Sequence, residues 1–506
     1  MTVYNINLGI GWASSGVEYA QAYRSTIFKN LGIDAKFVFM DFISRDNICD
    51  LTRNLGFLDD QVIWLYTFFT DQKMAPTTYT LEDLKKDFHG HLKRVERNKK
   101  LVKFYYPEQD IFLAAYLKNE TEDIVHRVEY VSRGCLIRKD YFTYTKSFTE
   151  YYAPKDGKAH LYRRCFYNEN GSVALEEIID GDATLYRTQG FVGDSKESLI
   201  GYFMQKLQLK PSDLVILDRA TGTGQAVFRH VKPAKLAIVI HAEHFSEHAL
   251  TKHTILWNNF YDYQFTNADK VDVFITATDK QEQLLAQHFA TYTQHRPTIM
   301  TIPVGSLDQL HYPSQPRQAY RVMTASRLAV EKHVDWLVKA VIEAKKVLPD
   351  LQFDIYGAGG QEKQLKDIIA KHQVEDSIHL KGHQDLTEVY QNYQVYLTAS
   401  KSEGFGLTLL EAIGSGLPII GFEARYGNQT FVREGENGYL IPKPANDDEG
   451  MIVAAFAKKI IAIYQEASLE PMHRVSYQIA EAYQTDKLEQ KWQHLVTTMV
   501  EGEAND

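Results

Sequence analysis

Two glutamates, Glu403 and Glu411, stand eight positions apart in the segment SEGFGLTLLE. The residues before Glu403 alternate as in a strand, and residues 407–416 have the pattern of a helix. Gly404 and Gly406 lie between these elements and allow backbone N–H groups to approach a ligand at the positive end of the helix. One carboxylate can bind hydroxyls of a sugar, while the other accepts both vicinal hydroxyls of a ribose. The spacing therefore predicts a site for a diphosphate-linked sugar, against the alternative of two solvated acids at an ordinary turn.

Two cations, Arg327 and Lys332, follow another expected strand, YRVMTAS. Arg327 ends this strand and Lys332 begins the next helix, so both belong to the carboxyl edge of a sheet, where α/β folds bind ligands. Both side chains can converge on a leaving diphosphate, which gains charge as the sugar–phosphate bond breaks. One preorganised donor at such a position contributes a rate factor of about 10²–10³. The alternative is a surface ion pair between Arg327 and Glu331.

The N-terminal half carries weaker signals. Gly16 follows Ser15 at the start of an expected helix near residues 17–31, and a lone glycine there is more often a turn than a phosphate cradle. His241 follows the apolar strand AIVI. From its position alone, His241 is equally a hydrogen-bonded core histidine and a ligand-binding group.

Two other chemistries have to be weighed in the same region. LVILDRATGTG places Gly222 and Gly224 after a strand, as in the glycine loop of S-adenosylmethionine-dependent methyltransferases, and Glu243 could then bind a ribose. However, Ala220 stands where the first glycine is expected, and the second half of the chain is left without a role. The histidines and acids around His241 have no convincing spacing for a metal. We therefore expect neither a methyltransferase nor a metal site.

The composition is that of a globular protein with more than one domain. The chain has 506 residues, of which 44% are hydrophobic and 24% charged. A net charge of −9 argues against general nucleic-acid binding, and three scattered cysteines fit a reducing compartment. The start lacks the features of a signal peptide, and no uncharged run approaches the ~20 residues that span a bilayer. We expect a cytoplasmic protein, with peripheral membrane contact at most, for instance through the basic run between Lys93 and Lys103.

Strand–helix alternation on both sides of a proline-rich stretch, residues 296–318, predicts two parallel, doubly wound sheets that face a cleft. The stretch between them reads as an interdomain linker. An intervening region rich in Tyr, Phe, Thr and Val, with regularly placed turn residues, predicts an antiparallel β-meander inserted into the first domain. The expected boundaries are residues 1–61 with 193–308, the insertion 62–192, a second domain 309–470, and C-terminal helices 471–506.

The glutamate pair and its glycines resemble the motif of retaining, nucleotide-sugar-dependent glycosyltransferases of family four, which have the GT-B fold. The resemblance implies that Glu403 binds the donor sugar, Glu411 the ribose, and Arg327 and Lys332 the diphosphate. It implies that His241 touches the transferred sugar and that no metal is needed. It also implies a donor-binding set formed by the backbone of Gly16, Val17, Glu18 and Tyr19, by His383 and Gln384 at the base, and by Gly404, Phe405 and Gly406.

Longer segments, among them NINLGIGWASSGVEYAQAYRS, IHAEHFSE and SEGFGLTLLEAIGSGLPIIGFEARYGN, resemble the A subunit of the accessory-Sec glycosyltransferase pair of Gram-positive bacteria. This resemblance spans the whole chain. It implies transfer of N-acetylglucosamine from UDP-GlcNAc to Ser and Thr hydroxyls of a serine-rich repeat adhesin. It also implies a complex with a homologous, catalytically silent B subunit, bound through the β-meander insertion.

Two alternatives remain open at this level. Arg425-Tyr426-Gly427 replaces the glycine-rich loop of most family-four enzymes and resembles the related teichoic acid glucosyltransferases, so UDP-glucose is an alternative donor. A sugar-binding or chaperone subunit with a decayed site, like the B partner, is the non-enzyme alternative. The intact set of Arg327, Lys332, Glu403 and Glu411 favours an enzyme.

Overall fold

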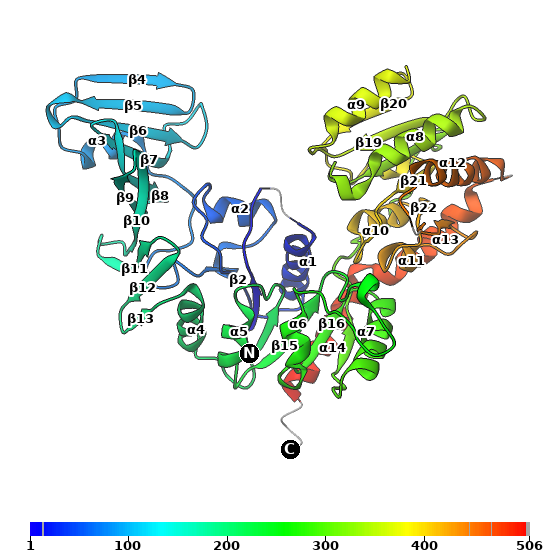
Figure 1. Ribbon diagram of the computed structural model, residues 1–506, viewed down its shortest axis with the longest axis horizontal. Coiled ribbons are helices and arrows are strands. Elements are labelled where there is room, and N and C mark those ends of the chain that lie inside the picture. Colours follow the sequence, from blue (N-terminus) through cyan, green and yellow to red (C-terminus); the bar gives the residue numbers. More distant parts are fainter. Residues whose placement is uncertain (13–14, 445, 467, 502–506) are drawn as a thin grey trace.

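A computed structural model describes residues 1–12, 15–444, 446–466 and 468–501 of the chain (Figure 1). It contains a seven-stranded, a ten-stranded and a six-stranded sheet. In Figure 1 the ten-stranded sheet, in cyan and teal, and the six-stranded sheet, in yellow to orange, rise on opposite sides of the seven-stranded sheet. The two smaller sheets are parallel and the largest is antiparallel, as the sequence predicts.

The seven-stranded sheet has the order β17-β16-β15-β14-β1-β2-β3. The chain runs outward from its centre in both directions, so the carboxyl ends of β1 and β14 form the switch point at which such sheets bind ligands. Its strands are β1 Val3–Asn7, β2 Ala35–Phe39, β3 Val62–Trp64, β14 Leu214–Leu217, β15 Lys235–Ile240, β16 Val273–Thr276 and β17 Ile299–Thr301. The helices around it are α1 Gly16–Asn30, α2 Ile48–Asn54, α4 Lys196–Lys206, α5 Gly224–His230, α6 Asp262–Thr266 and α7 Asp279–Tyr292.

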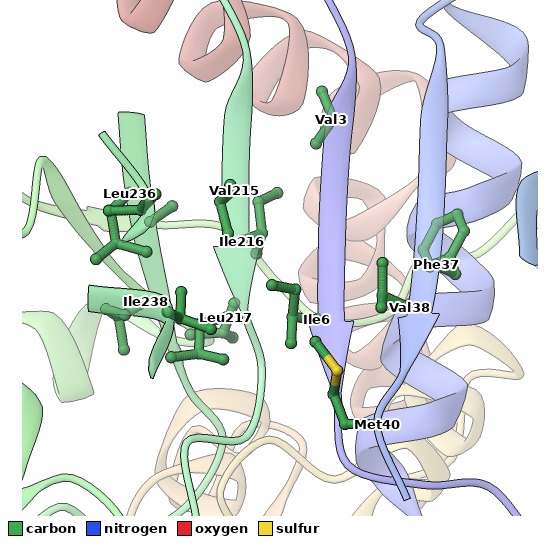
Figure 2. Packing of buried hydrophobic residues seen from close by; sticks show 14 of the residues in the cluster. Val3, Ile6, Phe37, Val38, Met40, Val215, Ile216, Leu217, Leu236 and Ile238 are labelled. Atoms are coloured by element: carbon green, nitrogen blue, oxygen red, sulfur yellow. The ribbon is translucent and has the colours of Figure 1, made fainter. Parts of the chain in front are cut away.

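The strands of this sheet form the centre of the largest apolar core (Figure 2). Val3, Ile6, Phe37, Val215 and Leu236 are fully buried. Helices cover both faces, which explains why β14 and β15 are continuous hydrophobic runs rather than alternating ones.

The C-terminal helix α14, Thr485–Glu501, returns to the first sheet. Leu488 and Trp492 are buried in the same core as β1 and β2. The Trp492 ring lies 5.3 Å from the ring of Phe28 on α1, and the Arg24 guanidinium lies 5.0 Å above it. The end of the chain therefore packs on the N-terminal half.

The ten-stranded sheet is a meander in which each strand pairs with the next along the chain, from β4 to β13. Its strands are β4 Arg94–Asn98, β5 Leu101–Tyr106, β6 Ile111–Leu117, β7 Val125–Ser132, β8 Cys135–Phe142, β9 Lys146–Lys155, β10 Lys158–Tyr167, β11 Val173–Asp180, β12 Ala183–Thr188 and β13 Phe191–Gly193, with helix α3 Leu81–Asp87 beside it. The expected insertion began too early, because β3 at residues 62–64 pairs with β2 in the parallel sheet.

The six-stranded sheet has the order β20-β19-β18-β21-β22-β23, again with its switch point between two central strands, β18 and β21. Its strands are β18 Arg321–Ala325, β19 Gln352–Tyr356, β20 Ile378–Gly382, β21 Val395–Thr398, β22 Ile419–Phe422 and β23 Gly438–Ile441. The helices around it are α8 Val334–Lys345, α9 Glu362–Lys371, α10 Leu407–Gly414, α11 Gly427–Phe431, α12 Glu449–Gln465 and α13 Glu470–Ala480.

The proline-rich stretch at 296–318 is only partly a linker. Its residues Ile299–Thr301 form β17, the edge strand of the first sheet, and pair with β16. None of the helices in the described residues is long and apolar enough to span a bilayer.

Candidate active site

Glu403 lies in the loop between β21 and α10, and its main chain is held by the loop after β22. The N–H of Glu403 donates to the carbonyl of Arg425 at 3.1 Å, and the N–H of Tyr426 donates to the carbonyl of Glu403 at 2.8 Å. The side chain of Glu403 accepts a hydrogen bond from Lys332 Nζ at 2.7 Å. Both side chains keep about a fifth of their surface exposed, 22% for Lys332 and 23% for Glu403. This ion pair therefore remains accessible to a ligand.

Lys332 reaches Glu403 from a short 3₁₀ turn, Val330–Lys332, rather than from the helix predicted to begin there. His333 follows in the left-handed conformation, with φ of 46°, and α8 begins at Val334. The reversal at His333 directs the chain from the turn into the helix. Lys332 therefore belongs to the turn that precedes α8 and not to the helix itself.

Arg327 is not brought to Glu403. Its side chain is 70% exposed and pairs with Glu331 at 3.2 Å, which is the surface ion pair weighed as the alternative. Its backbone is held closely, because the N–H of Leu328 donates to the carbonyl of Ala358 at 3.0 Å. A Cβ on Gly357 would lie 1.9 Å from the carbonyl oxygen of Ser326. The glycine run after β19 therefore positions this segment, a role that the sequence did not indicate.

Glu411 lies in the second turn of α10, where Tyr390 Oη donates to its Oε2 at 2.7 Å. Burial raises the pKa of Glu411, and the nearby charge of Asp385 adds to this effect. Tyr23 on α1 faces the same carboxylate, since burial and then the charge of Glu411 raise the pKa of Tyr23 to about 12. Glu411 therefore lies between its own domain and the first helix of the chain.

The predicted base-binding residues, His383 and Gln384, are exposed in the loop after β20. Gln384 Nε2 donates to the carbonyl of Lys381 at 2.7 Å. The adjacent Asp385 contributes to the shifted pKa of Glu411, so this loop lies near the predicted ribose acid. Its position supports a role beside Glu411, although neither side chain is oriented by another site residue.

His241 stands at the carboxyl end of β15, and its imidazole is held by a buried acid. Its Nε2 lies 2.8 Å from Asp218 Oδ1. Arg24 and Gln21 on α1 also bind Asp218, each at 2.8 Å. Burial alone would raise the pKa of Asp218, but the Arg24 guanidinium and the His241 hydrogen bond hold it well below its usual value. A charged Asp218 accepts from Nε2–H, which leaves Nδ1 of His241 for a ligand.

The two halves of the site meet at Gly404. A Cβ on Gly404 would lie 2.4 Å from the carbonyl oxygen of His241, so only glycine permits this approach. His241 and Glu403 thus come from different sheets and border the same place. The sequence predicted the glycine for a ligand, and the structure uses it for a contact between backbones.

The other predicted members of this loop differ in role. Phe405 is buried, with its ring 5.1 Å from Phe431 and 6.0 Å from Tyr483, so its side chain belongs to the core. Gly406 has φ of 88° at the start of α10 and is required by the backbone there. Both residues place the loop, and only their main chain can serve a ligand.

The start of α1 presents its backbone in the expected way. Ser15 caps the helix by accepting from the N–H of Val17 at 3.3 Å, and Glu18 returns to the N–H of Ser15 at 2.7 Å. The Glu18 carboxylate is therefore occupied by the cap, while Tyr19 is exposed. Among the residues that the structure describes, no atom lies within 4 Å of a Cβ built on Gly16.

Arg219, in the segment weighed as a methyltransferase loop, donates to Ser15 Oγ at 2.7 Å. Asp218 in that segment is buried in its contacts with Arg24 and His241, and Glu243, the acid weighed for a ribose, accepts a hydrogen bond from Tyr426. The sequence pattern of this segment did not indicate the contact of Asp218 with His241. Among the described residues, no group of three or more His, Cys, Asp or Glu side chains could hold a metal.

The chain is 56% identical over 497 residues to the GtfA subunit of the UDP-N-acetylglucosamine–peptide N-acetylglucosaminyltransferase of Streptococcus gordonii, and the match covers 98% of each chain. This chain belongs to the GtfA family of glycosyltransferases. Within the GtfA family, the solved pneumococcal O-GlcNAc transferase GtfA, in complex with UDP and GlcNAc, is 55% identical, with a TM-score of 0.94 and 99% of both chains covered. A solved GtfA/B complex is 54% identical, with a TM-score of 0.95, and covers 99% of this chain and 100% of the other.

Two family descriptions match parts of the chain. Residues 94–190 match the GtfA extended beta-sheet domain, and residues 313–480 match the glycosyl transferases group 1 family. Membership of the GtfA family confirms the predicted resemblance, the GT-B fold and the glycosyltransferase class. The methyltransferase alternative is therefore dropped.

Proposed function

We propose that this protein transfers N-acetylglucosamine from UDP-GlcNAc to Ser and Thr hydroxyls of a polypeptide, with retention of configuration. The observation that carries the proposal is the partly exposed Lys332–Glu403 pair, whose loop meets the backbone of His241 at Gly404. A cation, a carboxylate and an imidazole from two facing sheets suit a charged donor whose sugar must be oriented. The GtfA relatives are named for this donor and reaction.

The proposed roles follow from the groups present. Glu403 binds hydroxyls of the donor sugar, while Lys332 stabilises the departing diphosphate. Arg327 exchanges its exposed partner Glu331 for the same phosphates. His241 orients the sugar through Nδ1, and Glu411 accepts the hydroxyls of the ribose.

The remaining proposed contacts surround the donor. The N–H groups at the start of α1 face the phosphates, because the positive helix end favours an anion and no atom of the described residues crowds Gly16. His383 and Gln384 bind the base, and the backbone of Gly404, Phe405 and Gly406 lies beside the sugar. No residue here is assigned to a metal.

We further propose a division of labour among the sheets. The domain of the seven-stranded sheet, residues 1–64 with 193–308, faces the acceptor, and the second parallel domain, residues 309–470, binds the nucleotide sugar. The β-meander binds a homologous, non-catalytic B subunit, and the existence of a solved GtfA/B complex supports a partner subunit. The acceptor is a serine-rich repeat adhesin handled by an accessory Sec system, and the complex works in the cytoplasm, with peripheral membrane contact at most.

A donor screen tests this function. The protein, co-expressed with its B subunit, is incubated with a Ser/Thr-rich peptide and either UDP-GlcNAc or UDP-glucose, and the peptide is weighed by intact mass spectrometry. We expect the mass of N-acetylhexosamine to be added from UDP-GlcNAc. Addition of hexose alone would select the glucose alternative, and binding without release of UDP would identify a sugar-binding subunit.

A further inference from the structure

Tyr426 connects the two halves of the molecule by its side chain. It follows β22 in the second half, and its phenol is buried at 1% exposure. The phenol donates a hydrogen bond to Glu243 Oε1, and its oxygen lies 3.1 Å from His244 Nδ1. Glu243 and His244 lie in the loop after β15, directly beyond His241. The contact therefore crosses from one sheet to the other beside the site.

The main chain of the same residue holds the loop that carries Glu403. The N–H groups of Tyr426 and Gly427 both donate to the carbonyl of Glu403 at 2.8 Å. A Cβ on Gly427 would lie 2.0 Å from the carbonyl of Phe405, so the two loops are in close contact. Tyr426 therefore contacts the Glu403 loop through its backbone and the loop after His241 through its phenol.

We propose that Tyr426 is a positioning residue, whose bond to Glu243 sets the distance between Glu403 and His241 across the two halves. This inference rests on the proposed function, because it concerns the geometry in which the donor sugar is held. It also assigns a role to Arg425-Tyr426-Gly427, the segment in which the sequence departs from the glycine-rich loop of related enzymes.

The charges around this bond keep Glu243 in place. Arg425 pairs with Glu247 at 2.5 Å and lies 3.9 Å from Glu243, and Lys443 lies 3.9 Å from Glu247. Burial raises the pKa of Glu243, while the Tyr426 hydrogen bond and Arg425 oppose that rise. A buried carboxylate that loses its hydrogen-bond donor is costly. The loop would therefore rearrange if the phenol were removed.

The histidine beside Glu243 supports the same geometry from the other side. His244 Nε2 lies 3.0 Å from His288 Nδ1 on α7. Burial lowers the pKa of His244 to about 3, and His288 and Arg425 add to this effect. At neutral pH the imidazole is uncharged and bridges α7 to the phenol. Tyr426 is therefore connected to the domain of the first sheet through His244 and His288.

The first test compares Tyr426→Phe with Tyr464→Phe. The control lies on α12 and has a buried hydroxyl with no hydrogen-bond partner in the described part of the chain. Small misplacements at a reacting centre cost up to about a hundredfold in rate. We expect Tyr426→Phe to lower kcat by about tenfold or more, to change KM for the donor much less, and to raise UDP release relative to transfer. Tyr464→Phe should leave these values unchanged.

The partner residue supplies the rescue. Glu243→Gln keeps an oxygen that accepts from Tyr426, so its kcat should stay near that of the unmodified protein. Glu243→Leu should match Tyr426→Phe, and the double variant should be no worse than either, because both remove one bond. Additive losses, or a Tyr426→Phe variant with unchanged kcat and unchanged partition between UDP release and transfer, would overturn the proposal.

Hydrogen exchange tests the contact without any substrate. Tyr426→Phe should speed amide exchange at residues 402–406 and 241–247 while leaving β18 and β1 unchanged. Unaltered exchange in both loops would refute the proposal even if the kinetics changed. An inactive unmodified protein whose loops respond as expected would instead count against the proposed function and leave the contact supported.

Discussion

Glu403 and Lys332 neutralise each other across 2.7 Å, although each remains partly open to solvent. A donor phosphate can share Lys332 and leave the carboxylate to the hydroxyls of the sugar. Asp218 gives His241 a comparable partner on the opposite side, and Arg24 in turn balances Asp218. Glu403, Lys332 and His241 are therefore each held by another residue of the site before the donor arrives, whereas Arg327 pairs with Glu331 at the surface.

Replacing Glu403 by Gln should remove the charge while preserving the shape of the side chain. We expect kcat to fall by about a hundredfold or more, because one preorganised interaction at the reacting centre is lost. The melting temperature should change little, since the loop is held by main-chain bonds to Arg425 and Tyr426. Glu423→Gln, at an exposed position next to the same loop, is the matched control. Full activity of Glu403→Gln would remove Glu403 from the mechanism.

The raised pKa of Glu411 predicts that the stability of the folded protein depends on pH. Its pKa is raised by burial, so the folded protein prefers the protonated acid and loses stability as the pH rises through the unfolded and then the folded pKa. Glu411→Gln removes this loss. We expect it to raise the melting temperature at pH 7, with a difference that disappears below about pH 4. Thermal denaturation at both pH values measures this, and the same variant should bind UDP more weakly.

At the scale of elements, Gly404 and Gly16 differ in their surroundings, so substitutions there distinguish a structural role from a role in ligand binding. An alanine at Gly404 would press its Cβ against the His241 carbonyl, whereas the Cβ of an alanine at Gly16 would have no described atom within 4 Å. We expect Gly404→Ala to destabilise the protein by about 1–3 kcal/mol and to lower kcat, as overpacking does. Gly16→Ala should fold normally. Weaker UDP binding by Gly16→Ala in calorimetry would support a nucleotide at the start of α1, and unchanged binding would contradict it.

Within the whole molecule, the meander exposes apolar side chains on one face near the end of its last strands. Ile178 and Leu185 are 41% and 38% exposed and pair across β11 and β12, and Val192 on β13 is 63% exposed. Such a patch suits a protein partner. We expect Ile178→Glu to weaken co-purification of the B subunit by about tenfold while leaving UDP release intact. Met451→Glu, at an exposed position of α12 in the second parallel domain, is the control. Equal loss in both variants would argue against this face.

Contacts between distant segments fix the position of one parallel sheet relative to the other. Gly404 meets His241, Tyr426 meets Glu243, and α14 carries the end of the chain back to the first core. These contacts pair residues that are far apart in the chain. The site is a property of their arrangement and not of either half alone.

The sequence by itself determined the two parallel sheets, the inserted meander and the class of chemistry. Buried strands, helix starts and loops such as SEGFG are local patterns, and local patterns are readable from neighbouring residues. The sequence also placed Lys332 and Glu403 after strands of one parallel sheet, whose carboxyl ends gather at one edge.

Only the tertiary structure decided which groups support which. In the fold, Asp218 contacts His241, Tyr426 donates to Glu243, and Arg327 pairs with Glu331. Strand β3 and helix α14 belong to the domain of the first sheet. These contacts depend on how elements pack, and packing unites residues whose separation along the chain carries no signal in a single sequence. Asp218, whose segment resembles a glycine loop when taken alone, is in the folded protein the partner that holds His241.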